Sequence, residues 1–245
     1  MNDRYKEMAG RLIVALDYPD AEQAKALLQE LEGIPCYMKV GMQLYYAAGP
    51  AFVRELKTRG YQVFLDLKMH DIPNTVKGGA ESITRLGVDM FNVHAAGGKD
   101  MMMAALEGVD KALASDSSLH KPLVIAVTQL TSTGQEVLNG EIGIPGTVQD
   151  AVIRYAELTK SAGLDGVVAS AQEAGLITKA CGNDFVTVTP GIRPAGGDQG
   201  DQKRVLTPGE AIRGGSSYIV VGRPITGAEK PRTAAEQIIK EMLNA

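Results

Sequence analysis

Charged side chains that could perform acid–base chemistry accompany three short apolar runs near the start of the chain. Asp17 directly follows the first run, Lys39 lies in the second, Asp66 lies in the third, and Lys68 directly follows the third. Residues two apart on a strand share a face, so Asp66 and Lys68 are expected side by side, and Lys39 is expected opposite its two apolar neighbours. Charges of alternating sign stabilise one another when they are partly desolvated. We therefore predict one charged site from these four residues, although each alone is also typical of a strand that leaves the core.

Two arginines that follow later apolar runs indicate a phosphate site. Arg193 lies in the sequence Gly-Ile-Arg-Pro, and Arg223 lies in Gly-Arg-Pro-Ile directly after an apolar run. Backbone N–H groups at such turns bind phosphate, and a guanidinium adds two parallel hydrogen bonds. A loop arginine that faces only solvent is the alternative interpretation, and it applies more to Arg193 than to Arg223.

An alternation of apolar runs with amphipathic stretches must position these residues. Eight runs are typical of strands buried on both faces: 11–16, 36–40, 61–67, 88–94, 122–128, 166–169, 185–189 and 218–221. Stretches with helical spacing between them include 21–32, 51–59, 75–86, 99–114, 148–162 and 171–180. This pattern favours a closed α/β fold, a (β/α)8 TIM barrel, over an open doubly wound sheet. We predict a single domain over residues 1–245, with the active site at the carboxyl ends of the strands.

Two predicted connections at that end of the barrel are longer than the others. Residues 129–146 follow the fifth predicted strand, and residues 191–205 follow the seventh. Long loops inside a compact domain are commonly lids or binding loops. The second is rich in glycine and carries Arg193, which suggests a segment that closes over phosphate.

Composition excludes several classes of partner. Lysine and arginine number 25 against 29 aspartate and glutamate, so the formal charge is −4 and a nucleic-acid-binding surface is not expected. No apolar run approaches the roughly 20 residues of a membrane span, and the charged start lacks the apolar segment of a secretion signal, so we expect a cytoplasmic protein without membrane contact. The two cysteines cannot form a disulfide framework, and histidine and cysteine show no metal-ligand spacing. These patterns alone indicate a phosphate-binding barrel enzyme with a Lys/Asp site and no metal.

The segment of residues 66–75 resembles a segment of a known enzyme family. Residues 66–75 read Asp-Leu-Lys-Met-His-Asp-Ile-Pro-Asn-Thr, which resembles the Asp-x-Lys-x-x-Asp segment of the orotidine 5′-phosphate decarboxylases, in particular the bacterial branch. Further segments resemble that family in the same order over nearly the whole chain: Ile-Val-Ala-Leu-Asp at 13–17, Lys-Val-Gly at 39–41, Asn-Val-His-Ala at 92–95, Leu-Thr-Ser at 130–132, Asp-Gly-Val-Val-Ala-Ser at 165–170, Thr-Pro-Gly-Ile-Arg at 189–193 and Val-Gly-Arg-Pro at 221–224.

The resemblance implies a reaction and a role for each matching residue. The reaction would be the decarboxylation of orotidine 5′-phosphate to UMP in pyrimidine biosynthesis, without a cofactor. Lys68 would donate the proton, Asp66 would lie beside the scissile carboxylate, and Lys39 would complete the network with Asp71 of a partner subunit. The substrate-binding residues implied are Asp17 and Lys39 for the ribose, assisted by Thr75 of the partner, Thr131 for the pyrimidine edge, and Arg193, Gln202, Gly222 and Arg223 for the phosphate. The resemblance thus implies a homodimer with shared active sites.

Two other interpretations remain open at this point. A sibling barrel with the same Asp-x-Lys-x-x-Asp segment would be a metal-dependent decarboxylase or aldolase acting on sugar phosphates. It would require Mg²⁺ and would not need the long loop that carries Arg193. A non-catalytic sensor of nucleotide phosphates is the alternative from another class, but it leaves the paired lysines and aspartates without a purpose.

Overall fold

The computed structural model describes residues 2–194 and 205–245, and in these residues eight parallel strands close into a barrel. Neighbouring strands pair in chain order, and β8 pairs with β1 to complete the ring. The strands are β1 (Leu12–Ala15), β2 (Tyr37–Gly41), β3 (Gln62–Met69), β4 (Met90–His94), β5 (Leu123–Val127), β6 (Gly166–Val168), β7 (Val186–Thr189) and β8 (Tyr218–Val221). The predicted (β/α)8 TIM barrel of the α/β class is confirmed.

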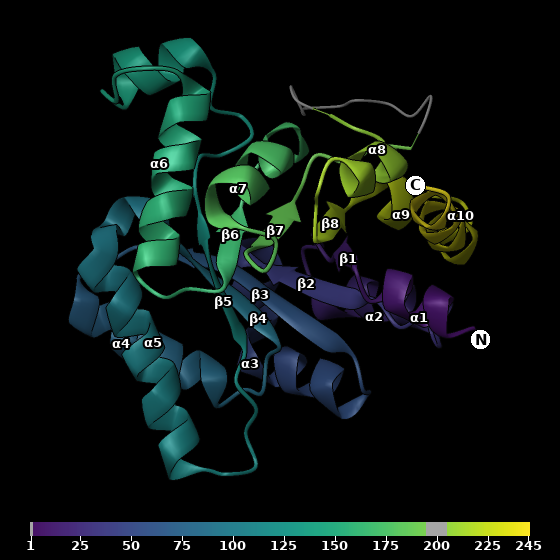
Figure 1. The fold of residues 1–245 in the computed structure, drawn as a ribbon. Helices are drawn as coiled ribbons and strands as arrows, with labels where there is room; N and C mark the ends of the chain where they lie inside the picture. The colour runs from purple at the N-terminus through teal and green to yellow at the C-terminus, as the bar shows by residue number, and fades with distance from the viewer. Residues whose placement is uncertain (1, 195–204) are drawn as a thin grey trace.

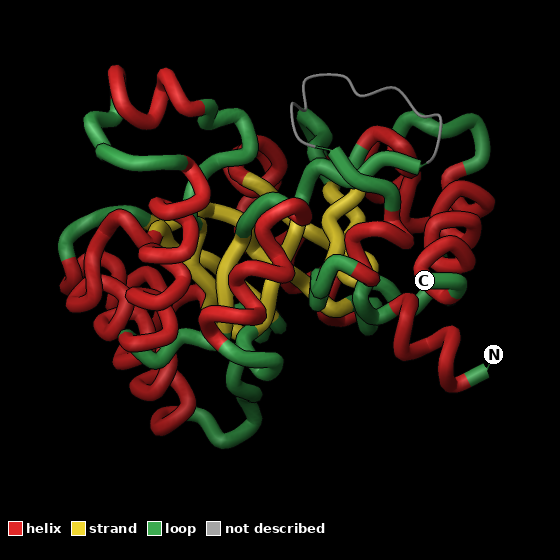
Figure 2. The backbone as a smooth tube through the Cα atoms, turned by 45° about the horizontal axis from the view of Figure 1, so that its top comes forward, coloured by secondary structure: helices red, strands yellow, loops and turns green. Residues whose placement is uncertain are grey.

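Helices surround the strands, as the backbone view in Figure 2 shows. They are α1 (Asp3–Ala9), α2 (Ala21–Glu30), α3 (Met42–Thr58), α4 (Pro73–Thr84), α5 (Gly98–Ser115), α6 (Val148–Ser161), α7 (Ala174–Cys181), α8 (Pro208–Arg213), α9 (Arg223–Thr226) and α10 (Pro231–Leu243). Short 3₁₀ turns precede α5 (Ala95–Gly97) and α7 (Ala171–Glu173), and a π-helical turn, Val137–Glu141, precedes α6. In the part of the chain that the structure describes, none of the helices has the length and apolar character needed to cross a membrane.

The helices depart from the predicted stretches where local signals compete. The predicted stretch 51–59 is the second part of α3, which begins at Met42 and bends at Gly49, whose φ of 67° is not helical. Because Pro50 follows that bend and proline is favoured at a helix start, the sequence pattern alone places the beginning of the helix too late. The structure also adds α1, α8, α9 and α10; α1 and α10 pack together near the two chain ends (Figure 1).

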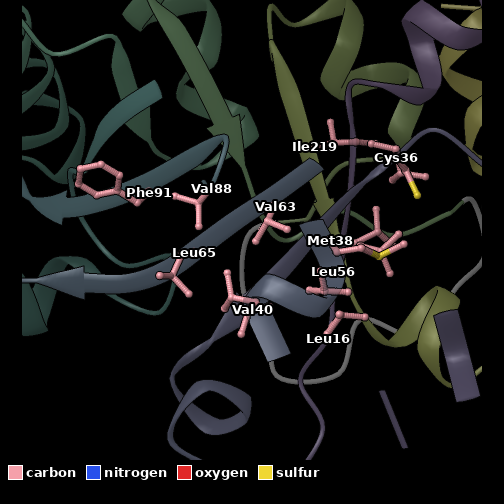
Figure 3. Close-up of a cluster of buried hydrophobic side chains, with 14 of the residues drawn as sticks. Leu16, Cys36, Met38, Val40, Leu56, Val63, Leu65, Val88, Phe91 and Ile219 are labelled. Carbon is pink, nitrogen blue, oxygen red and sulfur yellow. The ribbon is translucent and has the colours of Figure 1, made fainter. Parts of the chain in front are cut away.

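Alternation along the strands divides the core into two layers. One side of each strand faces the barrel axis, where Ile13, Tyr37, Phe64, Met90 and Ile125 are buried together with other inward side chains. The other side packs against the helices, and Figure 3 shows part of this larger layer, including Met38, Val40, Val63, Leu65 and Phe91. Strands buried on both faces explain why the eight runs are continuously apolar rather than alternating. Where an inward position carries a charge, it lies at the carboxyl end of a strand.

The seam between the first and last strands is held by Arg11, directly before β1. Its backbone carbonyl accepts the N–H of Ile219, and its guanidinium donates to the carbonyls of Ser216 at 2.7 Å and Ser217 at 2.8 Å. Burial lowers the pKa of the guanidinium. One partly buried cation therefore satisfies two carbonyl groups that precede β8.

We predict that Arg11→Met destabilises the fold by about 2–3 kcal/mol, because two carbonyls lose charged hydrogen-bond donors while the apolar stem is kept. Equilibrium unfolding in urea measures this loss. Arg4→Met is the matched control: Arg4 is exposed and donates to the carbonyl of Leu243, so its replacement should cost less than about 0.5 kcal/mol. Equal losses of unfolding free energy in the two variants would show that the hydrogen bonds of Arg11 do not stabilise the pairing of β1 with β8.

Candidate active site

The four predicted charges converge at the carboxyl ends of three neighbouring strands. Lys39 continues the inward face of β2 that begins with Tyr37, and Asp66 continues the inward face of β3 after Phe64. The register pairs Ala15 with Lys39, and it pairs residue 41 with residue 66. Lys39 therefore lies opposite Met38 and Val40, as predicted.

These side chains form one chain of ion pairs. The Lys39 ammonium lies 3.0 Å from Asp17 Oδ1 and 3.3 Å from Asp66 Oδ2, and the Lys68 ammonium lies 2.7 Å from Asp66 Oδ1. The order Asp17–Lys39–Asp66–Lys68 alternates in sign throughout. Asp66 and Lys39 are buried, whereas the outer member Asp17 keeps a side chain that is 60 % exposed.

Lys68 joins this chain through an unusual backbone conformation. Its φ is 52°, which among the described residues other than glycine is the one positive value, and the pairing of β3 with β4 shifts register between Leu65 and Met69. The expected two-residue alternation therefore does not continue through Lys68. The left-handed conformation costs a residue with a side chain about 1–3 kcal/mol, so surrounding contacts must hold it.

Asn92 supplies these contacts, and the sequence reasoning assigned it no role. Its side-chain Oδ1 accepts the backbone N–H of Lys68 at 2.8 Å, and its Nδ2 donates to Asp66 Oδ1 at 2.7 Å. Asn92 is buried on β4 two residues after the inward-facing Met90. The sequence did contain a signal that could have identified Asn92, because it is a polar residue at an inward position of an otherwise apolar strand.

Gly41 gives the ion pair room. A Cβ atom at this position would lie 3.1 Å from Lys39 Nζ and 3.2 Å from Asp17 Oδ1. Both distances are tighter than ordinary van der Waals contact, so a side chain here would push apart the two charges. Glycine at the end of β2 is therefore part of the site.

Burial and charge act in opposite directions on the two central groups. Burial favours the neutral form of Asp66, but the charges of Lys39 and Lys68, with hydrogen bonds from Lys68 and Asn92, keep its pKa below the ordinary value. Burial also favours neutral Lys39, but the carboxylates of Asp66 and Asp17 raise its pKa above the ordinary value. Both groups are therefore ionised at neutral pH.

A pocket of about 670 Å³ opens at these charges. Its lining brings together eight of the predicted residues: Asp17, Lys39, Asp66, Lys68, Thr131, Arg193, Gly222 and Arg223. Arg193 is buried rather than solvated, and its side chain donates to the carbonyl of Ile192 at 2.9 Å. The pocket wall thus carries the lysines and aspartates on β1–β3 and the two arginines after β7 and β8.

Three predicted residues are not in this lining. Asp71 and Thr75 are exposed beyond the end of β3, and Asp71 Oδ1 accepts the backbone N–H of Ile72 at 2.7 Å. Neither residue lines the pocket of its own chain. Gln202 lies outside the described residues. Among the residues that are described, no three histidine, cysteine, aspartate or glutamate side chains converge as a possible metal site.

Fold and pocket define this protein as an α/β-barrel protein with a charged, arginine-rimmed pocket at the carboxyl ends of its strands. The family model "Orotidine 5′-phosphate decarboxylase / HUMPS family" matches residues 10–238, and the chain belongs to this family.

Individual relatives agree with this assignment. The orotidine 5′-phosphate decarboxylases of Bacillus cytotoxicus and Bacillus mycoides are each 52 % identical over 231 residues, covering 94 % of this chain and 96 % of theirs. The crystal structure of orotidine 5′-phosphate decarboxylase from Lactobacillus acidophilus is similar with a TM-score of 0.85 and 42 % identity, over 96 % of this chain and 99 % of that one. An uncharacterised conserved protein from Geobacillus kaustophilus has a TM-score of 0.83 at 44 % identity, over 94 % and 99 %.

We predict that Asp66→Asn destabilises the protein by about 3 kcal/mol at pH 7, because the buried ammonium of Lys39 and the partly buried ammonium of Lys68 lose the charge between them. The pKa of Asp66 is lower in the folded state, so its ionisation stabilises the fold above the ordinary aspartate pKa, and this stabilisation is lost as pH falls through the folded-state value. The difference between wild type and variant should therefore shrink below about pH 4. Urea unfolding at pH 7 and pH 3 measures both gaps.

Asp110→Asn is the control for this experiment. Asp110 is an exposed aspartate on α5, and its replacement should change stability by less than about 0.5 kcal/mol at either pH. A gap for Asp66→Asn that is the same at pH 7 and pH 3 would contradict the assigned ionisation of Asp66.

Proposed function

We propose that the protein decarboxylates orotidine 5′-phosphate to UMP, the reaction named for its curated relatives, in the pathway of pyrimidine synthesis. We place the active site in the pocket at the carboxyl ends of the strands of one domain spanning residues 1–245. The observation that carries the proposal is the ion-pair chain from Asp17 to Lys68 in a pocket that is also lined by Arg193 and Arg223.

The chemistry of the substrate explains why such a chain is useful. Breaking the bond between C6 and the carboxylate releases CO₂ and leaves an electron pair in the plane of the ring, where the ring carbonyls cannot delocalise it. Fixed charges in a partly desolvated site stabilise a developing anion more than water does. The Lys68 ammonium is such a charge, and it also carries the proton that C6 needs.

In the proposed mechanism Lys68 transfers one proton from Nζ to C6 as the bond to CO₂ breaks or directly afterwards. Asp66 is held ionised beside the place of the substrate carboxylate, so repulsion between the two would be relieved as CO₂ leaves. Lys39 keeps Asp66 in position and prevents it from taking up the proton. We propose that the reaction proceeds without a cofactor.

The remaining pocket residues would hold the nucleotide. We assign the ribose to Asp17 and Lys39, the pyrimidine edge to Thr131, and the phosphate to Arg193 and to Gly222 with Arg223 at the start of α9. Gln202 is assigned to the phosphate by resemblance. Contacts to a phosphate far from C6 can stabilise a closed site that excludes water.

We further propose a homodimer in which Asp71 and Thr75 complete the partner's site. Their exposure beyond β3, outside the pocket of their own chain, supports this arrangement. Ile72 between them is 67 % exposed, which suits an apolar contact in an interface. A cytoplasmic location is supported by two free cysteines, Cys36 and Cys181, both buried.

Purified protein should decarboxylate orotidine 5′-phosphate, measured as the fall in its ultraviolet absorbance, and EDTA should leave the rate unchanged. Lys68→Ala should lower kcat/KM by at least about 10³-fold, because it removes the proton donor and a charge at the reacting carbon, while UMP still binds. Lys77→Ala is the control, since Lys77 lies on α4 and pairs with Glu107 away from the pocket.

Two outcomes would contradict the proposal. Complete loss of activity in EDTA that Mg²⁺ restores would favour a metal-dependent enzyme acting on sugar phosphates. Tight nucleotide binding without any turnover would favour a sensor.

The shared site predicts complementation between two inactive variants. Lys39→Ala and Asp71→Ala should each be nearly inactive, but a hybrid dimer should have one site with both changes and one with neither. Random pairing of equal amounts makes half the dimers hybrid, so about a quarter of all sites should regain wild-type activity. Each variant mixed with itself is the control. If Asp71 served its own chain, a verified hybrid would recover nothing.

A further inference from the structure

Asn92 contacts both charged residues of β3 but does not line the pocket. Its side chain is buried on β4, with Oδ1 accepting the backbone N–H of Lys68 and Nδ2 donating to Asp66 Oδ1. A backbone N–H can only donate and an ionised carboxylate can only accept, so these two neighbours fix the orientation of the amide. A side chain of this length must therefore carry one acceptor and one donor to satisfy both.

Asp66 distributes its two oxygens among three donors. Oδ1 accepts the Lys68 ammonium at 2.7 Å and the Asn92 amide at 2.7 Å, whereas Oδ2 lies 3.3 Å from the Lys39 ammonium. An amide N–H carries no formal charge and does not ionise near neutral pH. Of the two donors on Oδ1, the Asn92 amide is therefore the one that keeps its charge state when Lys68 gives up a proton.

The proton transfer proposed above removes part of the support of Asp66, and the inference rests on that proposed function. A proton leaves Lys68 Nζ, and the electrons of its N–H bond stay on the nitrogen. The electron pair left at C6 by the departing CO₂ forms the new C–H bond. Lys68 is then a neutral amine beside a buried carboxylate, whose burial favours the neutral form. The affinity of Asp66 for a proton therefore rises while a proton is being transferred beside it.

The other groups around Asp66 do not replace the lost charge on Oδ1. Lys39 stays on the other oxygen. Burial, together with nearby positive charge, lowers the pKa of His94 at the end of β4, so this ring is neutral at neutral pH. The residue of β5 that pairs with Asn92 is the apolar Ile125. Within the described part of the chain, the Asn92 amide is then the remaining fixed donor to Oδ1.

We propose that Asn92 directs the catalytic proton to C6 by positioning its donor and by keeping Asp66 from accepting it. Oδ1 of Asn92 holds the backbone of Lys68 at its φ of 52°, which sets the direction of the ammonium. Nδ2 occupies Asp66 Oδ1 throughout the transfer and stabilises the ionised carboxylate. Asn92 is thus a positioning residue, which acts through Lys68 and Asp66 without touching the substrate.

Asn92→Asp tests this role because it keeps the size of the side chain and changes one group. The introduced carboxyl still offers an oxygen to the N–H of Lys68. Toward Asp66 it presents an O–H donor when protonated and a second negative oxygen when ionised. Burial and the like charge raise the pKa of such a pair, so the donor is present at low pH and is lost as pH rises. The ratio of variant to wild-type kcat, per UMP-binding site, should fall at least about tenfold from pH 5.5 to pH 8.

Asn183→Asp is the matched control. Asn183 is exposed in the turn before β7, at the opposite end of the barrel from the pocket. The same chemical change there should leave the ratio to wild-type kcat constant over this pH range. Because every rate is divided by the wild-type rate at the same pH, groups that also titrate in the wild type, such as His94, do not contribute.

Asn92→Leu separates a positioning role from a structural one, because it removes both hydrogen bonds at similar size. It should lower kcat at least about tenfold at every pH, since the lost hydrogen bonds involve charged residues of the site. The affinity for UMP, measured by calorimetric titration, should change less than about threefold, because Asn92 does not line the pocket. A structural role would instead weaken UMP binding together with kcat.

Three outcomes would overturn the proposal. The first is a kcat ratio for Asn92→Asp that stays constant from pH 5.5 to pH 8, and the second is a wild-type kcat in Asn92→Leu. The third is loss of UMP binding in both variants, whether by unfolding or by a distorted pocket, which assigns Asn92 a structural role. Turnover of orotidine 5′-phosphate by the wild type is measured alongside: its absence rejects the proposed function, whereas normal wild-type turnover with any of the three outcomes rejects only the role of Asn92.

Discussion

The contact of one buried carboxylate with two ammonium groups is the interaction on which the rest of the site depends. Asp66 lies 3.3 Å from the Lys39 ammonium and 2.7 Å from that of Lys68. Neither lysine could be held so close to the other without the charge between them, and Asp66 could not remain ionised at such burial without both. Each of the three charged residues therefore depends on the other two for its position and its ionisation.

The barrel makes this unit possible because it fixes the three strands before any ligand arrives. Pairing of β1, β2 and β3 sets the separation of the charges, Gly41 leaves room for them, and Asn92 from β4 holds Lys68 in its left-handed conformation. Arg11 fastens the seam between β8 and β1 on which the closed ring depends. Charges that are already in place need little reorganisation when a negative charge develops, and this is the main source of electrostatic stabilisation in enzymes.

Local periodicity predicts most of the fold and the inward direction of Lys39 and Asp66, because each depends only on neighbouring residues in one strand. The conformation of Lys68 was not predictable in this way, since a hydrogen bond from a different strand maintains it. The burial of Arg193 also escaped prediction, because it accompanies pairing with a segment distant in the sequence, where the backbone N–H of Arg193 donates to the carbonyl of Leu206. The sequence analysis missed residues 42–48 of α3. Pro50 is a strong signal for the start of a helix, so the helix was predicted to begin after it, whereas in the structure α3 continues through the bend at Gly49.

The central claim is that Asp66 is an ionised carboxylate held between two lysines in the protein without substrate. Its most direct test is a carbon-13 NMR titration of the folded protein with labelled aspartate carboxyls, in which the Asp66→Asn variant identifies the Asp66 resonance. We predict a pKa for Asp66 below the 3.8 of an ordinary aspartate, with the carboxyl fully ionised at neutral pH. A pKa at or above 3.8 would show that burial outweighs the two lysines and would contradict the account.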